Sequence, residues 1–170
     1  MKPLILPLLL LSLAYSHIGV AQTCKPNIAP DAPNNRYRLS AEGTAFDKQT
    51  GLVWMRCALG QTWAGNTCTG TVREYTWQGA LQAAESTVFA GRSDWRLPNQ
   101  KELQSLVEWR CAAPAINLTA FPNTPSYRHW SSSPVAYNNY YAWFVYFYYG
   151  YGSWDYKNGN YAVRLVRSGQ

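Results

Sequence analysis

Tyrosine side chains gather in the last third of the chain, where a dense group of phenol rings could bind a ligand. Nine of the 13 tyrosines lie between residues 137 and 161. A phenol ring offers a large contact area with few rotatable bonds, and its hydroxyl can donate or accept a hydrogen bond. Burying all of these hydroxyls would require an internal partner for each one. The tyrosine tract therefore predicts a displayed binding surface.

The side chains of residues 142–148 divide into two groups if this segment is a strand, because successive side chains of a strand point to opposite faces. The apolar odd positions, which we expect in the core, are Trp143, Val145 and Phe147. The even positions, which we expect to be displayed, are Ala142, Phe144, Tyr146 and Tyr148. A strand buried on both faces is the main alternative. A low-complexity segment prone to aggregation is a weaker one, because glycines and a lysine interrupt the tract.

The strongest catalytic interpretation is a hydrolytic site around His129. It precedes a run of serines at 131–133, and Asp94 could orient the imidazole. However, neighbouring residues of a strand face opposite ways, and the sequence contains no Gly-x-Ser-x-Gly elbow. It also has no clear carboxylate pair for glycoside hydrolysis, no phosphate or dinucleotide loop and no calcium loop. We therefore expect no enzymatic activity, no cofactor and no metal site.

Four cysteines, at positions 24, 57, 68 and 111, fit a pair of disulfides in an exported protein. Four cysteines allow three pairings. The turn-prone Gly65-Asn66 in the short intervening loop favours a Cys57–Cys68 bridge, which would leave Cys24 to pair with Cys111. A zinc site is less favoured because the sequence has no Cys-x-x-Cys pair.

The formal net charge of +6 resides mainly outside the tyrosine tract. Between residues 137 and 161 the charged residues are Asp155 and Lys157. Binding a nucleic-acid backbone requires clustered cations beside the aromatic rings, so we expect no nucleic-acid partner. Arginines elsewhere could form a patch for a sulfated or acidic polysaccharide. They are Arg36, Arg38, Arg92, Arg96, Arg110, Arg128, Arg164 and Arg167.

The N-terminal residues predict export. A lysine at position 2 precedes an almost continuous apolar run over residues 4–13, and small residues follow at Gly19 and Ala21. This pattern is typical of a signal peptide spanning residues 1–21. The run is too short for a confident membrane span, so we expect a secreted, periplasmic or cell-surface protein without an integral span in the mature chain. The mature chain would then comprise a tail at 22–35 and one domain at 36–170.

Alternating strands and helices are expected along that domain. Residues 36–39, 45–47 and 52–55 have strand patterns, with Gly51 in the turn of a hairpin. Apolar residues at 77, 80, 81, 84 and 88 predict one helix, and Asn99 with Glu102 predicts the capped start of a second helix that ends near Cys111. Further strands are expected near 129–132, 142–148 and 161–167. These elements predict an α+β domain.

Five segments, taken in order, resemble the family of the C-terminal domain of the collagen-like adhesin Lcl. They are Thr50-Gly51-Leu52-Val53-Trp54, Gly91 with Asp94-Trp95-Arg96-Leu97-Pro98, Glu102-Leu103 with Leu106-Val107, Trp130-Ser131-Ser132, and Val163-Arg164-Leu165-Val166-Arg167. The resemblance runs from about residue 36 to the end of the chain. It implies a C-type-lectin-like fold, with two helices flanking antiparallel sheets and a loop-rich face for ligands. In the adhesin that names the family, these ligands are sulfated glycans.

A narrower resemblance links the tract to the variable proteins of diversity-generating retroelements. It rests on Trp130-Ser131-Ser132-Ser133-Pro134, on the Tyr/Asn-rich vocabulary of residues 137–161, and on Ala162-Val163-Arg164-Leu165-Val166-Arg167. In such systems a reverse transcriptase copies a template with errors at adenines, so asparagine codons become Tyr, Ser, Asp and others. The scaffold residues that the resemblance implies are Trp143, Val145, Phe147 and Trp154. The implied diversified positions are Gly159 and our candidate ligand-binding residues Tyr137, Asn138, Asn139, Tyr140, Tyr141, Phe144, Tyr146, Tyr148, Tyr149, Tyr151, Ser153, Asp155, Tyr156, Asn158, Asn160 and Tyr161.

Together these observations predict an exported display protein whose tyrosine tract binds a protein or glycan ligand. The alternative is a fixed glycan-binding adhesin domain that uses its arginines. A formylglycine-generating type of enzyme is a third, less favoured interpretation, since no local residue set would carry its oxidation chemistry. Calcium-dependent sugar binding is unsupported, because Leu97-Pro98-Asn99 lacks the acid of the C-type-lectin triplet.

Overall fold

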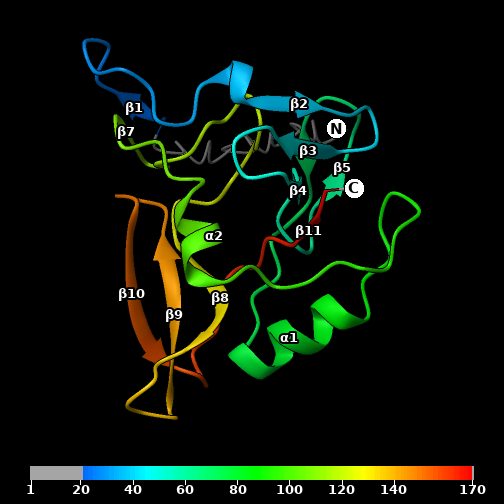
Figure 1. Ribbon diagram of the computed structural model, residues 1–170, viewed down its shortest axis with the longest axis vertical. Helices are drawn as coiled ribbons and strands as arrows, with labels where there is room; N and C mark the ends of the chain where they lie inside the picture. Colours follow the sequence, from blue (N-terminus) through cyan, green and yellow to red (C-terminus); the bar gives the residue numbers. More distant parts are fainter. Residues whose placement is uncertain (1–20, 170) are drawn as a thin grey trace, which may run out of the picture.

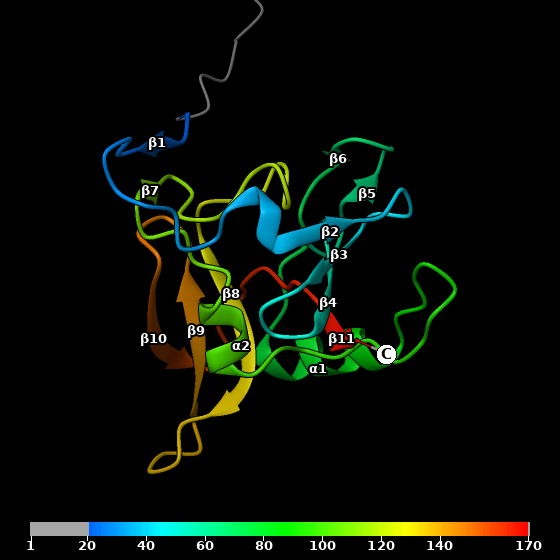
Figure 2. The ribbon, with the colours of Figure 1, turned by 45° about the horizontal axis from the view of Figure 1, so that its top comes forward.

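The computed structural model describes residues 21–169, so nearly all of the predicted signal peptide lies outside the described residues. Within this range the α-helices are α1 (Trp77–Glu85) and α2 (Gln100–Gln104), and the strands of each sheet pair antiparallel. Figures 1 and 2 show a three-stranded sheet on one side of the molecule and a four-stranded sheet beside it. This mixture confirms the predicted α+β class. None of the helices between residues 21 and 169 is long and apolar enough to cross a membrane.

The four-stranded sheet joins the two ends of the predicted domain. Its strands are β2 (Tyr37–Leu39), β3 (Thr44–Asp47), β4 (Leu52–Met55) and β11 (Val166–Ser168), in the order β11-β4-β3-β2. The predicted hairpin is confirmed. Its turn contains Gly51 with a φ of +72°, a backbone conformation that glycine adopts without a Cβ clash. The strand expected at 161–167 begins only at Val166.

The three-stranded sheet contains most of the tyrosine tract. It consists of β8 (Arg128–Pro134), β9 (Tyr141–Tyr146) and β10 (Tyr151–Tyr156), in the order β10-β9-β8. The register of β9 and β10 runs without a shift from Tyr151 opposite Tyr146 to Tyr156 opposite Tyr141. Sequence reasoning did not identify β10 as a strand. The tract is therefore a complete hairpin with a loop before it.

Both predicted helices exist, but both end earlier than expected. Thr76 caps α1 by accepting a hydrogen bond from the Gly79 amide, and the helix ends at Glu85, whereas Val88 is 73% exposed. Asn99 and Glu102 form the predicted capping box of α2. The chain then leaves the helix at Gln104, because the amides of Leu106 and Val107 bond three residues back in tight turns. The predicted end near Cys111 is wrong.

The N-terminal segment 22–35 packs against the domain, so the prediction of a separate tail before the ordered structure is wrong. Its strand β1 (Thr23–Cys24) pairs with β7 (Cys111–Ala112). Farther on, Ala32 is fully buried, and its amide donates to the Glu108 carboxylate over 3.1 Å. The segment continues through a 3-10 turn, η1 (Asn34–Arg36), into β2. The prolines and asparagines of this segment indicate an irregular backbone, but they do not indicate whether the segment contacts the domain.

Two disulfides close the fold with the preferred pairings. Cys24 bonds to Cys111, 87 residues away, and Cys57 bonds to Cys68, 11 residues away. The short bridge spans a small hairpin of β5 (Thr62–Trp63) and β6 (Cys68–Thr69). The long one joins β1 to β7.

The interior divides into two apolar clusters that lie on opposite sides of β9. The first core contains Tyr37, Trp54, Leu103, Leu106, Phe121, Val145 and Phe147 among its members. The second core contains Trp95, Leu97, Trp130, Ala142, Phe144 and Leu165 among its members. Because β9 contributes side chains to both cores, its middle is covered on both faces.

Candidate ligand-binding surface

In the middle of β9, the side chains at even positions are not exposed on the surface. Val145 and Phe147 are buried as expected, but Phe144 is only 3% exposed, so its predicted place on the displayed surface is wrong. Phe144 packs against Tyr161 with ring centroids 5.5 Å apart, and the Arg128 guanidinium lies 5.0 Å from its ring centre. The strand buried on both faces, our main alternative, is correct at this position.

A group of tyrosines that we term the turn cluster surrounds the connection between β9 and β10. It consists of Tyr146, Tyr148, Tyr149 and Tyr151. The rings of Tyr148 and Tyr149 meet edge to face at 4.6 Å, and those of Tyr146 and Tyr151 at 5.5 Å. Tyr149 is 60% exposed and Tyr151 46% exposed. These contacts hold the rings in place while leaving large parts of them open to a partner.

A second group, the end cluster, lies at the opposite end of the same hairpin. It consists of Tyr141, Trp154 and Tyr156, with centroid distances from Tyr141 of 4.8 and 4.4 Å. The adjacent Tyr156 hydroxyl raises the pKa of Tyr141 above its ordinary value. Trp154, which the retroelement resemblance implies as a scaffold residue, is 42% exposed. Its cross-strand neighbour Trp143 is half-buried.

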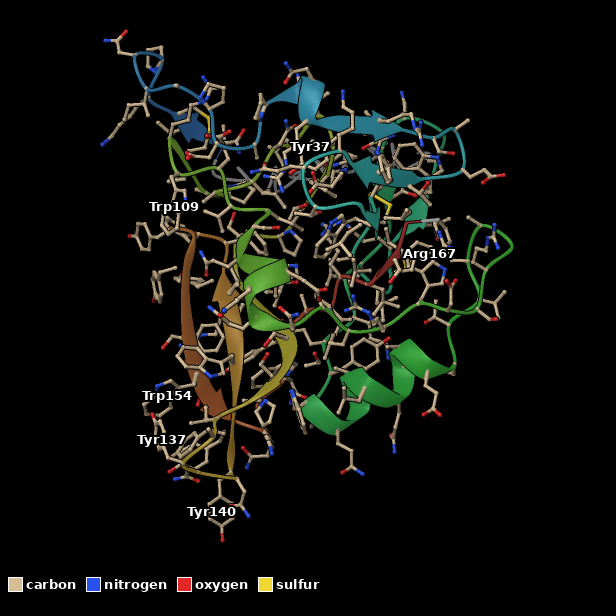
Figure 3. All side chains as sticks on the ribbon, viewed as in Figure 1. Tyr37, Trp109, Tyr137, Tyr140, Trp154 and Arg167 are labelled. Carbon is tan, nitrogen blue, oxygen red and sulfur yellow. A yellow bond between two sulfur atoms is a disulfide. The ribbon has the colours of Figure 1, made fainter. Side chains whose placement is uncertain are left out.

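The loop between β8 and β9 extends the end cluster with the most exposed rings of the tract. Tyr137 is 78% exposed and Tyr140 69% exposed. The Asn138 side chain accepts a hydrogen bond from the Tyr140 amide over 3.0 Å, so Asn138 shapes the turn. Figure 3 shows Tyr137, Tyr140 and Trp154 at one end of the sheet, away from Trp109.

A shallow groove of about 240 Å³ adjoins this loop. Its lining residues are Asn139, Tyr140, Tyr156, Lys157 and Asn158. Lys157 and Asn158 also line a neighbouring hollow at the start of α1, where the Lys157 ammonium lies 4.4 Å from the Trp77 ring centre. Neither Trp77 nor Lys157 belonged to the predicted site. The groove combines ring faces with amide groups, a surface suited to hydrogen-bonding ligands.

A polar triad links β8, β10 and the segment after β10. Arg128 Nη1 donates to Asp155 Oδ2 over 2.9 Å and to the Tyr161 hydroxyl over 2.6 Å, and that hydroxyl donates to Asp155 Oδ2 over 2.5 Å. Partial burial opposes ionisation of Asp155, but the Tyr161 hydrogen bond and the Arg128 charge still hold its pKa below the usual value. Arg128 was absent from the predicted ligand-binding residues. The parallel bridge between His129 and Ala162 brings Tyr161 close to it, and its guanidinium lies over the Phe144 ring on the side of Asp155.

The predicted ligand-binding residues do not form one continuous patch. Cross-strand pairing places Tyr146, Tyr151 and Asp155 on one face of the hairpin, and the end cluster on the other. Ser153, opposite Phe144, is half-buried, whereas Asn158 and Asn160 are exposed in the segment that follows β10. The exposed rings therefore surround the outer part of the hairpin.

Most of the arginines considered for an anionic ligand are already paired. Five form salt bridges with Asp or Glu, namely Arg36, Arg96, Arg110, Arg128 and Arg167. Arg164 is fully buried and donates to the carbonyls of Met55 and Arg56. Arg38 and Arg92 are exposed. The structure thus does not assemble the eight residues into one basic patch.

The hydrolytic arrangement considered around His129 is not assembled. His129 is fully buried, and its Nδ1 lies 3.1 Å from the Tyr127 carbonyl. Burial and then the charge of Arg164 lower the pKa of His129 to about 3. Ser131 donates to the Trp143 carbonyl, and Asp94 is bound by Arg167. Residues 21–169 bring no three His, Cys, Asp or Glu side chains into a metal-binding group.

Comparison with known proteins identifies one family. The sequence profile of the Lcl C-terminal domain matches residues 43–167. The matched segment includes both helices, the three-stranded sheet and the whole tyrosine tract. No curated protein matches the chain.

Proposed function

The chain belongs to the Lcl C-terminal domain family, and from this premise we propose that it is an exported ligand-binding module with a C-type-lectin-like fold. Its binding surface consists of two patches around the outer part of the hairpin. One is the turn cluster, and the other is the end cluster with the loop between β8 and β9. The observation that carries the proposal is the exposure of six aromatic side chains on one hairpin and its loop. They are Tyr137, Tyr140, Tyr149, Tyr151, Trp154 and Tyr156. Exposed aromatic side chains gathered in this way mark interaction sites more often than scattered ones do.

The chemistry of the surface favours a protein or glycan ligand. Its rings provide contact area, and the phenol hydroxyls and the amides of Asn139 and Asn158 provide hydrogen bonds. Arg128 is neutralised by Asp155, so the surface lacks the clustered cations that a nucleic acid would need. Each engaged ring contributes about 0.5 to 1.5 kcal/mol beyond area burial, so three or four rings could form the centre of an interface.

We also propose that this surface is diversified by a retroelement. Positions such as Tyr137, Tyr140 and Tyr149 point away from the cores, so replacing their side chains would change ligand contacts with little cost in stability. Phe144 is different because it belongs to the second core. Asp155 and Tyr161 are hydrogen-bonded to each other and to Arg128, so changes at either position would alter the other.

The diversification has a direct genomic test. The DNA next to the gene should contain a near-copy of the sequence encoding residues 130–170 that differs almost only at adenines, with a reverse-transcriptase gene close by. A genome that contains neither would refute diversification and leave the binding proposal standing.

Export and a non-enzymatic role are parts of the same proposal. The two disulfides fit an oxidising compartment, and residues 1–21 would be the cleaved signal peptide. The mature chain would act as a single unit, with segment 22–35 packed on the domain. All four cysteines are paired, so the described residues offer no free thiol for oxidation chemistry.

Binding can be tested with the mature chain on arrays of glycans and surface proteins. We expect that a variant with Tyr137→Ser, Tyr140→Ser, Tyr149→Ser and Tyr151→Ser loses the interactions of the parent chain. A matched control with Leu39→Ser and Val88→Ser also removes exposed apolar side chains, but outside the surface. Equal loss in the control would contradict the assignment of the surface. Loss only with Arg38→Ala and Arg92→Ala would favour the arginine-dependent adhesin instead.

A further inference from the structure

Strand β10 forms an open edge of the three-stranded sheet. It is the last strand in the order β10-β9-β8, and among residues 21–169 Figures 1 and 2 show no element beyond it. The Lys157 amide donates to the Tyr140 carbonyl over 2.9 Å, which continues the β9–β10 register. Because bonded and non-bonded pairs alternate in an antiparallel ladder, Gly152, Trp154 and Tyr156 direct their backbone groups away from β9.

Only part of this edge is free to bind. The Tyr156 amide donates to Asp155 Oδ1 over 2.8 Å, and the Tyr156 carbonyl accepts from the Gly159 amide over 2.9 Å. At the other end, the Gly150 amide and carbonyl are bound to Tyr146 and Gln104. The available edge therefore consists of the N–H and C=O groups of Gly152 and Trp154.

The edge also lacks the usual features that prevent strands from pairing. Natural edge strands are protected by proline, bulges or charged side chains. β10 contains no proline and keeps an unshifted register with β9. Its one charged residue, Asp155, is held by Arg128 and Tyr161. A six-residue edge of this kind is suited to pairing with another strand.

We propose that β10 pairs antiparallel with β10 of a second copy of this chain, with the two-fold axis at Ser153. Gly152 of each copy would then lie opposite Trp154 of the other, and their free groups would form four backbone hydrogen bonds. The two serines would face each other as a close, non-bonded pair, which their small side chains accommodate. Tyr151 would face Asp155 of the second copy.

This register is the one that the charges and the existing hydrogen bonds allow. An axis at Asp155 would place two carboxylates opposite each other, which is destabilising. An axis at Trp154 would require Tyr156 to give up its bonds to Asp155 and Gly159. An axis at Gly152 would require Gly150 to give up its bonds to Tyr146 and Gln104. The axis at Ser153 breaks none of these bonds, so the strand is complementary to itself.

The inference is independent of the proposed ligand-binding function and goes beyond it. Edge pairing depends mainly on the backbone, so the exposed aromatic side chains of the two patches stay available to a ligand. It would join the two sheets into one and place two aromatic surfaces side by side. Two linked surfaces would bind a multivalent ligand more tightly than one does.

Sedimentation equilibrium of the mature, oxidised chain tests the pairing. The interface is small, so we expect a reversible dimer over concentrations from about 1 µM to about 1 mM. Ser153→Lys and Ser153→Glu each place like charges at the axis and should weaken self-association more than about tenfold. An equimolar mixture of these two variants should regain dimers, because opposite charges then meet. Matched controls are Asn139→Lys and Asn139→Glu, which make the same charge changes in the loop outside β10.

The mixture also distinguishes loss of pairing from loss of folding, because unfolded variants could not regain a dimer. A parent chain that stays monomeric throughout the range would overturn the inference and leave the edge to another partner. Equal weakening by the Asn139 variants, or no recovery in the mixture, would overturn it as well.

Discussion

Individual residues of the tract have different roles despite their similar chemistry. Phe144 and Tyr149 lie five positions apart, yet the first is 3% exposed and the second 60% exposed. Phe144 is covered by Tyr161 and Arg128, which come from other parts of the chain. Exposure of an aromatic residue here is decided by what packs on it. The positions free to vary therefore have to be chosen individually.

A single residue, His129, should make the stability of the fold depend on pH. Its pKa is lowered to about 3 by burial, compared with about 6.5 in the unfolded chain. The unfolded state therefore binds a proton first as pH falls below about 6.5, and stability declines until the folded-state pKa is reached. We expect the free energy of unfolding to decrease by about 2–3 kcal/mol between pH 7 and pH 4.5. Urea unfolding at several pH values measures this change.

The control for this prediction is His129→Leu, which fills the site with a group that does not titrate. It should lose most of the slope in this window, whatever its absolute stability. The pKa values of Asp47, Asp155 and Glu102 are lowered, so their stabilising effects are lost nearer pH 4 and below. An unchanged slope in the variant would show that His129 is not the group responsible.

Among the elements, the β9–β10 hairpin depends on the backbone geometry of its turn. Gly150 has a φ of +86°, and an added Cβ would lie 2.5 Å from Val107 Cγ1 and 3.2 Å from the Ala115 Cβ. Its backbone conformation and its packing both exclude a side chain. The same turn carries Tyr149, whose side chain points into solvent. A fixed position and a replaceable one are therefore adjacent.

Gly150→Ala should lower the free energy of unfolding by roughly 2–4 kcal/mol, from left-handed backbone strain and overpacking together. Tyr149→Ala, the matched control one residue away, should change it by about 0.5 kcal/mol or less. Urea denaturation monitored by tryptophan fluorescence gives both values. Similar values for the two variants would contradict the proposed importance of the turn geometry.

The two disulfides constrain loops of very different length in the whole molecule. Cys24–Cys111 closes a long loop and joins the N-terminal segment to the domain, whereas Cys57–Cys68 closes a short one. In the chain-entropy model, the stabilisation grows with the logarithm of loop length. The long bridge should therefore stabilise the molecule more than the short one.

Replacing Cys24 and Cys111 together by alanine should cost about 4–5 kcal/mol, and replacing Cys57 and Cys68 about 3 kcal/mol. Chemical denaturation of the two double variants under identical conditions compares them. A greater loss from the short bridge would show that native contacts, not loop entropy, dominate. The long-bridge variant should also expose segment 22–35 to limited proteolysis.

The sequence by itself determined the features that depend on local chemistry. Gly51 marked the hairpin turn, Asn99 and Glu102 marked a helix start, and the short loop between Cys57 and Cys68 favoured the observed bridge. The local concentration of tyrosine was equally visible. These signals operate within about a dozen residues, so no knowledge of distant neighbours is needed.

Only the tertiary structure decided which side chains of the tract are covered. Strand periodicity indicates which residues share a face, but it does not indicate whether a core lies against one face or both. Two cores meet at β9, so Phe144 became buried, and the bridge between His129 and Ala162 brought Tyr161 to Arg128, which also binds Asp155. Burial and long-range pairing arise from segments distant in sequence, and for that reason local patterns could not predict them.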